Sequence, residues 1–330
     1  MRLVMVELHR VLARKAVWLA VVGAVVVVLV ALFGVHQAAL SVNASRANAQ
    51  QILEEQLAWW EESGQEEADR CFAEQETARR QSGDARIDFG CEQMARPPQL
   101  EDFLMSMPSL ARQYEELLGY LVYPFLFLAL ALGSTSVAAE FTHRTMGSWL
   151  TFVPRRVPVF LSKVLAAALA AVPVVGLGLV LLLLGVPALF RFHGIDDGVS
   201  GPQWVSLAWM ALRIVLLAMI AGALGAAAAF LLRHSAAVLG LMIGYLVLAE
   251  GILRGMVTGL TPYLLGVNID AFVKHGTEWV EWPTFCDDVT VMCREIVHPV
   301  SFAHGATVLL ALLAVVVVAG LLHFRRADVS

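Results

Sequence analysis

Long apolar segments constrain this chain more than any other feature. A helix needs about 20 apolar residues to cross the hydrocarbon core of a bilayer. Six segments reach or approach that length: 16–38, 117–139, 159–189, 214–232, 236–253 and 302–322. Hydrophobic residues make up 58% of the chain and charged residues 15%, with a mean hydropathy of +0.71. This composition excludes a pair of soluble domains, so we predict an all-α integral membrane protein with six transmembrane helices.

The distribution of charge predicts the orientation of these spans. Lys and Arg gather in four segments: 1–15, 140–158, the turn at 233–235 and the tail 323–330. If the chain crosses the membrane six times, all four segments lie on the same side. By the positive-inside rule this side is the cytoplasm, so both termini are expected there. Residues 39–116 fall on the other side and carry sixteen Asp or Glu against seven Arg, a net charge of −9. This asymmetry gives no support for a nucleic-acid partner. The Ala-, Val-, Leu- and Arg-rich composition fits a bacterial source, so we expect a bacterial plasma (inner) membrane.

The first fifteen residues have the pattern of an amphipathic helix. Val4, Met5, Leu8 and Val11 repeat at helical spacing, while the charged residues, Arg2, Glu7, Arg10 and Arg14, take the other arc. We predict a helix on the inner membrane surface. A simple cytoplasmic extension of the first span is the alternative.

All four cysteines fall in segments predicted to lie outside the cytoplasm. Residues 39–116 are rich in Ala, Glu and Gln, which predicts a helical domain built as a hairpin or helix pair. An even number of cysteines on the oxidising side indicates disulfides, and three connectivities are possible. Proximity alone favours Cys71 with Cys91 and Cys286 with Cys293. A metal site with His275 or His298 is the alternative, although the spacing fits no zinc pattern.

Pro and Gly residues mark unusual features in the later spans. Span 159–189 contains Pro173 and Pro187 among several glycines, so we predict that it is bent or broken. Span 214–232 has small residues four apart, which predicts close helix packing within the chain or, as an alternative, a dimer seam. Segments 190–213 and 254–301 are expected outside, the second containing a short helix or a re-entrant element.

Enzymatic motifs are missing from the sequence. It has no GxxxxGK[ST] loop, no Gly-Lys pair and no HExxH, so no route to ATP hydrolysis or zinc proteolysis is visible. The segment Gly133 to Ser136, GSTS, with His36 or His304 as base, leaves an intramembrane hydrolase as a weaker alternative. We predict no catalytic, cofactor or metal site on this chain.

Three charged residues stand in or beside the predicted spans. Arg213 lies at the outer edge of span 214–232, Glu250 lies inside span 236–253, and Arg254 follows one turn later. A charge in hydrocarbon costs about 2.5–3.5 kcal/mol on insertion scales, so a partner is expected. We predict that Glu250 pairs with Arg213 or Arg254, either to fix two spans or to line a translocation path.

The stretch EFTHRTMGSWLTFVPRRVPVFLSK, residues 140–163, resembles a pattern of the ABC-2 type permeases, the membrane subunits of ATP-binding cassette exporters. The matching positions are Glu140, Thr145, Leu150, Pro154, Arg155 or Arg156, and Lys163, whereas Arg144 stands where the family has Gly. The family is similar over nearly the whole chain: a surface helix, six spans, a cytoplasmic loop after the second span and an outer helix before the last.

The resemblance implies a role for residues 140–158 as the loop that couples to a soluble ATPase. The implied coupling residues are Glu140, Arg144, Thr145, Trp149, Pro154, Arg155, Arg156 and Lys163. A loop whose charges only enforce topology is the alternative. The resemblance also implies two ATPase subunits that carry ATP and Mg, a second identical or related permease, and export of a drug, lipid or peptide. The large outer domain leaves a second function open, that of an ATPase-linked mechanotransmitter with an extracytoplasmic partner.

Overall fold

The structure, a computed structural model, describes residues 2–83, 86–103, 109–147, 155–195, 198–281 and 295–326. The chain divides into two compact units. Unit 1 comprises residues 1–32, 109–188 and 196–330, and unit 2 comprises residues 33–108 and 189–195. Six helical stretches are long and apolar enough to cross a membrane, as the hydropathy pattern predicts: Lys15–Ser82, Leu110–Thr142, Arg156–Phe192, Gly201–Leu232, Ser235–Met256 and Phe302–Arg326.

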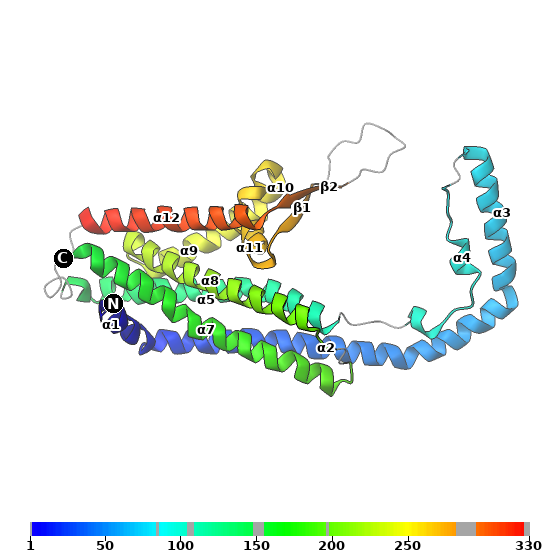
Figure 1. Ribbon diagram of the computed structural model, residues 1–330, viewed down its shortest axis with the longest axis horizontal. Helices are drawn as coiled ribbons and strands as arrows, with labels where there is room; N and C mark the ends of the chain where they lie inside the picture. Colours follow the sequence, from blue (N-terminus) through cyan, green and yellow to red (C-terminus); the bar gives the residue numbers. More distant parts are fainter. Residues whose placement is uncertain are drawn as a thin grey trace. The chain divides into compact units, whose positions relative to one another are not determined.

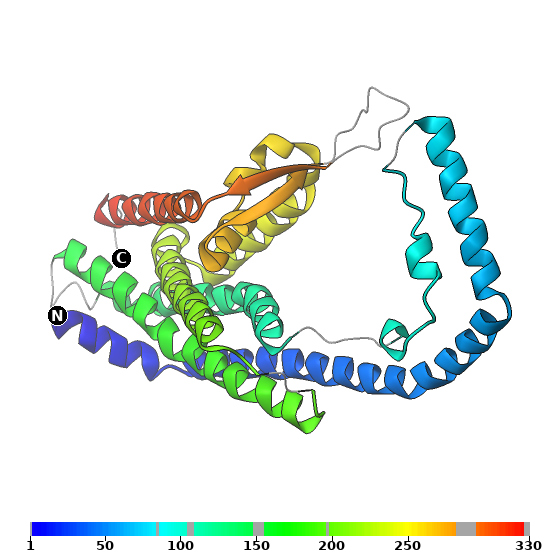
Figure 2. The same ribbon diagram turned by 45° about the vertical axis from the view of Figure 1, so that its right-hand side comes forward.

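Unit 1 is a bundle of long helices with a small subdomain of short helices and two strands (Figures 1 and 2). Helix α1 ends before α2 begins, so α1 is a separate helix and no extension of the first span. Helix α8 packs against both α5 and α12. The helices are α1 (Arg2–Leu12), the first part of α2 (Lys15–Trp59), α5 (Leu110–Thr142), α7 (Arg156–Phe192), α8 (Gly201–Leu232), α9 (Ser235–Tyr245) and α12 (Phe302–Arg326).

Glycines bring three of these helices into close contact. A Cβ atom at Gly133 of α5 would collide with the carbonyl oxygen of Gly222 in α8, and one at Gly225 of α8 would collide with that of Leu130. On another side, a Cβ at Gly222 would lie 2.8 Å from the carbonyl oxygen of Ala167 in α7. The small-residue pattern of the fourth span therefore serves packing within the chain.

Helix α7 is continuous despite its prolines. Pro173 and Pro187 both lie inside a single helix of 37 residues. The prediction of a broken span is therefore wrong on this point. Proline removes one backbone donor without ending a membrane helix, because neighbouring groups can satisfy the freed carbonyl.

An aromatic cluster joins four helices at the end of unit 1 where α1 begins and α12 ends (Figure 1). The ring of Phe230 in α8 lies 4.7 Å from Phe160 of α7 and 4.8 Å from Phe324 of α12, between ring centroids. Phe141 of α5 meets it edge-on at 5.8 Å. Such contacts bury large apolar areas and fix this end of the bundle.

The opposite end of unit 1 carries short elements between α9 and α12. A π-helical stretch, η3 (Leu246–Leu253), continues α9 and passes through α10 (Arg254–Met256) into a 3-10 helix, η4 (Thr258–Tyr263). Helix α11 (Leu265–Lys274) follows, and it confirms the expectation of a short helix. Strands β1 (Thr277–Glu281) and β2 (Ile296–Val300) then pair antiparallel, with Trp279 opposite His298, in a hairpin that the sequence did not predict.

Unit 2 is dominated by one long helical run. The second part of α2 continues through a π-helical turn, η1 (Trp60–Gly64), into α3 (Gln65–Ser82). Over the described residues two short helices, α4 (Cys91–Met94) and η2 (Leu100–Phe103), follow, so this segment is helical as predicted. The predicted Cys71–Cys91 disulfide is present, and it holds the returning segment against α3. Buried Gln75 and Arg79 reinforce this clip by hydrogen bonds to Phe89 N and Ile87 O.

Candidate functional site

Five charged side chains from three segments meet at the α1 end of unit 1. Three of them, Glu7, Glu140 and Lys163, are only 3% exposed. Arg10 and Arg14 lie at the edge, with 36% and 25% of their side chains exposed. We call Glu7, Arg10, Arg14, Glu140 and Lys163 the charge network. Charged groups this deeply buried need oppositely charged or hydrogen-bonding partners, because an unpaired charge away from water is very costly.

Lys163 is the centre of the charge network. Its Nζ lies 3.0 Å from Glu7 Oε1 and 2.7 Å from Glu140 Oε2. Arg14 Nη2 lies 2.9 Å from the other oxygen of Glu140, and its Nη1 donates to the carbonyl oxygen of Ser136. Arg10 completes the set, 3.4 Å from Glu7 and 3.7 Å from Glu140. Each carboxylate therefore faces at least two cations.

The local sequence explains why these groups converge. Glu140 lies in the last turn of α5, and Lys163 lies two turns into α7, three residues after the buried Phe160 on the same helical face. Arg14 stands in the break between α1 and α2, where the chain turns. The network thereby ties α1, α5 and α7 together. Removal of one partner from such a buried cluster costs about 3–5 kcal/mol, because another charge is left unpaired.

The structure separates the predicted coupling residues into two groups. Glu140 and Lys163 are buried in the charge network, and Arg156 Nη1 donates to the carbonyl oxygens of Phe324 and Arg325 at the end of α12. These three residues join parts of the chain to each other. Arg144, Thr145 and Arg155 are exposed and available to a partner. Trp149 and Pro154 lie outside the described residues.

Arg144 adopts the conformation that favours glycine. Its φ angle is +55°, in the left-handed region, just after the end of α5. Arg144 stands where the resembled pattern has Gly. The turn therefore has the left-handed backbone that glycine favours, although its residue is an arginine.

Sequence reasoning missed the role of three network members. The sequence places Glu7, Arg10 and Arg14 on the charged arc of the amphipathic helix, and the structure buries Glu7 of this arc against Lys163. Met5 on the other arc is 60% exposed, which leaves an apolar surface of α1 free for the membrane. The sequence does contain a signal for this buried pairing: Glu7 is the only acidic residue in the basic segment 1–15.

Glu250 has hydrogen-bond partners in place of the predicted arginine. Its Oε1 accepts from Gly266 N at 2.7 Å and from the hydroxyl of Tyr245 at 3.2 Å. Within the described part of the chain it forms no ion pair with Arg213 or Arg254, so that prediction is wrong. Arg213 Nη1 instead donates to the carbonyl oxygen of Val273, at the end of α11, and Arg213 Cζ lies 5.9 Å from the Phe302 ring centroid.

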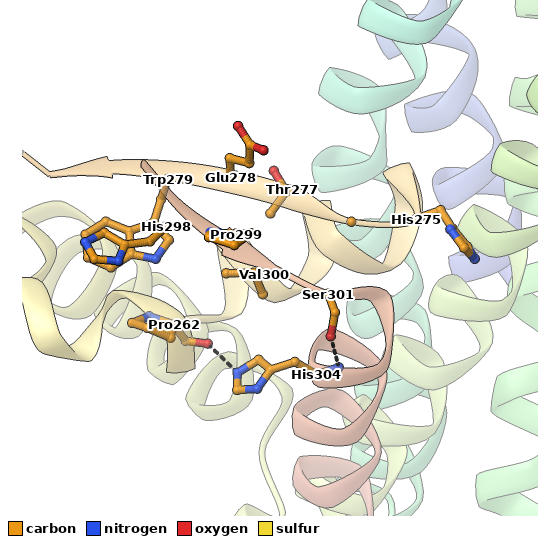
Figure 3. A pocket seen from close by; sticks show the side chains of 11 residues that line it. Pro262, His275, Thr277, Glu278, Trp279, His298, Pro299, Val300, Ser301 and His304 are labelled. Carbon is orange, nitrogen blue, oxygen red and sulfur yellow. Dashed lines mark hydrogen bonds between the residues drawn. The ribbon is translucent and has the colours of Figure 1, made fainter. Parts of the chain in front are cut away.

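The hairpin forms one wall of an open pocket of about 850 Å³. Figure 3 shows Trp279 stacked on His298, with ring centroids 4.4 Å apart. His298 Nε2 lies 3.0 Å from Glu281, and His304 Nε2 donates to the carbonyl oxygen of Pro262. Over the described residues, no three His, Cys, Asp or Glu side chains share a position suited to a metal. Cys286 and Cys293 lie outside those residues, so their pairing stays a prediction.

The serines of the GSTS segment have ordinary helical partners. Ser134 and Ser136 donate to the carbonyl oxygens of Ala131 and Gly133 in their own helix. In the part of the chain that the structure describes, neither hydroxyl is hydrogen-bonded to a histidine. A serine nucleophile needs such a base within reach, so this geometry gives the hydrolase alternative no support.

Comparison with known proteins agrees with the membrane architecture. The family model described as "ABC-2 family transporter protein" matches residues 3–329. No curated protein and no solved structure matches the chain. A family match over nearly the full length includes the charge network, the six long apolar helices and the outer elements alike. The chain therefore belongs to the ABC-2 family of transporter proteins, as a multi-pass membrane permease.

Proposed function

We propose that this chain is the permease subunit of an ATP-driven exporter whose ATPase is a separate protein. The charge network is the observation that carries the proposal. It holds α1, α5 and α7 together through Glu140, the first residue of the proposed coupling loop 140–158, and Lys163, which follows that loop in α7. A push on that segment would therefore move three helices as one body.

The division of labour among the coupling residues follows from their exposure. Arg144, Thr145 and Arg155 are exposed and would contact the ATPase, together with Trp149 and Pro154 of the same loop. Glu140, Lys163 and Arg156 would pass the motion to α5, α7 and α12. This end of unit 1 would face the cytoplasm of a bacterium, with both termini on that side.

The proposed assembly has two ATPase subunits and two permeases, identical or related. ATP and Mg would bind only to the ATPases. Closure of the ATPases would tilt the helices and expose a central path alternately to each side. A drug, lipid or peptide of hydrophobic or amphipathic character would be the substrate, since the spans offer few charged groups.

Unit 2 supports a second candidate function. Helix α2 begins in unit 1 and continues in unit 2 through η1 into α3, where a disulfide and the Gln75 and Arg79 hydrogen bonds hold the returning segment against α3. A rigid outer domain on a membrane helix could move an extracytoplasmic partner without passing any substrate. Transport remains our first choice because of the six spans.

Purification of the tagged chain from its native membrane in a mild detergent tests the proposal. We expect mass spectrometry to identify a phosphate-loop ATPase in stoichiometric amount. Arg155→Glu should lose that protein, because it reverses an exposed charge in the loop. Arg112→Glu is the matched control, since Arg112 is also an exposed arginine and lies at the other end of α5. Absence of an ATPase from the wild-type preparation, or equal retention in both variants, would refute the docking role.

A further inference from the structure

An apolar groove of about 570 Å³ runs along the outside of unit 1. It is lined by α5, α8, α9, η3, α11 and α12, and extends from Val238 near the start of α9 to Arg254 after η3. Almost all of its lining is aliphatic or aromatic. The volume lies within the range of about 300–1,000 Å³ that is typical of small-molecule sites.

Two opposite charges stand at one end of this groove. Glu250 and Arg254 both line it, beside the hydroxyl-bearing Tyr123 and Tyr245. The rest of the groove, toward Val238 and Val316, is apolar. A ligand that fills it needs a long apolar part and a polar head at the Glu250 end.

Neither charge is neutralised by a partner in the part of the chain that the structure describes. Glu250 uses Oε1 to hold Gly266 N and Tyr245, whereas Oε2 accepts no hydrogen bond there. Arg254 is exposed and forms neither a hydrogen bond nor an ion pair with a described residue. The two lie four residues apart on one helical stretch, a spacing at which ion pairs form readily. No ion pair joins them within the described residues, so the Arg254 guanidinium and the Oε2 oxygen of Glu250 are both left for a ligand.

The π-helical conformation of η3 contributes to this arrangement. Glu250 lies inside the stretch Leu246–Leu253, and Arg254 is the first residue after it. A π-helical insertion changes the direction of side chains relative to a regular α-helix and is common at functional sites. The hydrogen bonds from Gly266 and Tyr245 then fix the carboxylate in the groove.

We propose that the groove binds a zwitterionic amphiphile, with its cationic group on Glu250, its anionic group on Arg254 and its tail along α9. Charge complementarity selects this class: an anionic amphiphile would face Glu250, and a cationic one would face Arg254. An apolar ligand would leave both charges unpaired in a low-dielectric site. The occupant is a membrane lipid of zwitterionic head, and calling it the exported substrate rests on the proposed function.

Photolabelling of the full chain in lipid nanodiscs tests this inference. Three lipid analogues share one diazirine-bearing tail and differ only in the head: zwitterionic phosphocholine, anionic phosphoglycerol and a cationic trimethylammonium without phosphate. Labelled peptides of α9 and α5 are counted by mass spectrometry. We expect the phosphocholine analogue to label the groove about fivefold more than either other analogue, the factor that one charge pair of about 1 kcal/mol provides.

Charge-removal variants sharpen the test. With Glu250→Gln only Arg254 remains, so the anionic analogue should label best; with Arg254→Gln the cationic analogue should label best. The double variant Arg112→Gln with Glu116→Gln is the matched control, because it removes an exposed ion pair outside the groove and should keep the wild-type order. The wild-type comparison stands by itself if a variant fails to fold.

Three results would overturn the proposal. Equal labelling by all three heads in the wild-type chain would mean ordinary surrounding lipid. No labelling of the groove would mean that another occupant, such as a second copy of the chain, covers it. An order that both variants leave unchanged would remove the roles of Glu250 and Arg254. The labelling experiment needs no ATPase. A failure of the lipid proposal is therefore distinguishable from a failure of the proposed coupling to an ATPase.

Discussion

Single residues in this protein carry charge into places that usually exclude it. Lys163 is as buried as the surrounding alanines and phenylalanines, yet two carboxylates lie within 3.0 Å of its ammonium group. Arg156 reaches across to the end of α12, and Arg213 reaches the end of α11. Long cationic side chains thus connect helices, because they reach carboxylate or backbone carbonyl oxygens on a neighbouring helix.

Arg144 offers a residue-scale prediction. A side chain in the left-handed region is strained, and glycine relieves that strain at some cost in unfolded-state entropy. We expect Arg144→Gly to stabilise the detergent-solubilised chain by about 0.5–1 kcal/mol, seen as a higher midpoint of thermal unfolding. Arg144→Ala removes the same charge but keeps a Cβ atom, so it should give no gain. An equal gain from both variants would assign the effect to charge and contradict the backbone explanation.

Helices in this protein are joined differently along their length. In the middle, glycines of α5 and α8 allow backbone contact, as at Gly133 and Gly222. At the α1 end, the charge network and the ring of Phe230 bind the helices through side chains. A tilt at the α1 end would therefore be carried into α5 and α7 with little loss, since neither junction can slide freely.

The tie between α1, α5 and α7 gives an element-scale prediction. Lys163→Met leaves Glu7 and Glu140 buried with fewer cations, so we expect a loss of about 3–5 kcal/mol in unfolding free energy. Lys274→Met is the control, because the Lys274–Asp270 pair is half exposed and such pairs contribute about 0–1 kcal/mol. Denaturant unfolding in mild detergent measures both. Similar losses for the two lysines would contradict a special role for the charge network.

Elements differ in how far the sequence alone predicts them. The six apolar helices follow from length and hydropathy, and the Cys71–Cys91 disulfide follows from proximity. The burial of Glu7 and the partners of Glu250 do not, because a polar arc has the same pattern whether it faces water or a buried lysine. The hairpin was missed because its two strands are five residues each and separated in sequence.

At the scale of the whole molecule, the proposed function assigns the translocation path to this chain and ATP hydrolysis to a separate protein. The chain belongs to a transporter family, and its sequence contains no phosphate-binding loop. The exposed Arg144, Thr145 and Arg155 lie at the α1 end of unit 1, close to the charge network. An ATPase bound there would act on the helices that line the apolar groove through α5.

ATP hydrolysis by the purified assembly tests this central claim most directly. The tagged chain is isolated from its native membrane, and phosphate release is measured per mole of chain for the wild type, Arg155→Glu and the control Arg112→Glu. We expect hydrolysis in the wild type and the control and a fall to background in Arg155→Glu. Equal hydrolysis in all three preparations, or none in the wild type, would contradict an ATPase docked at this loop.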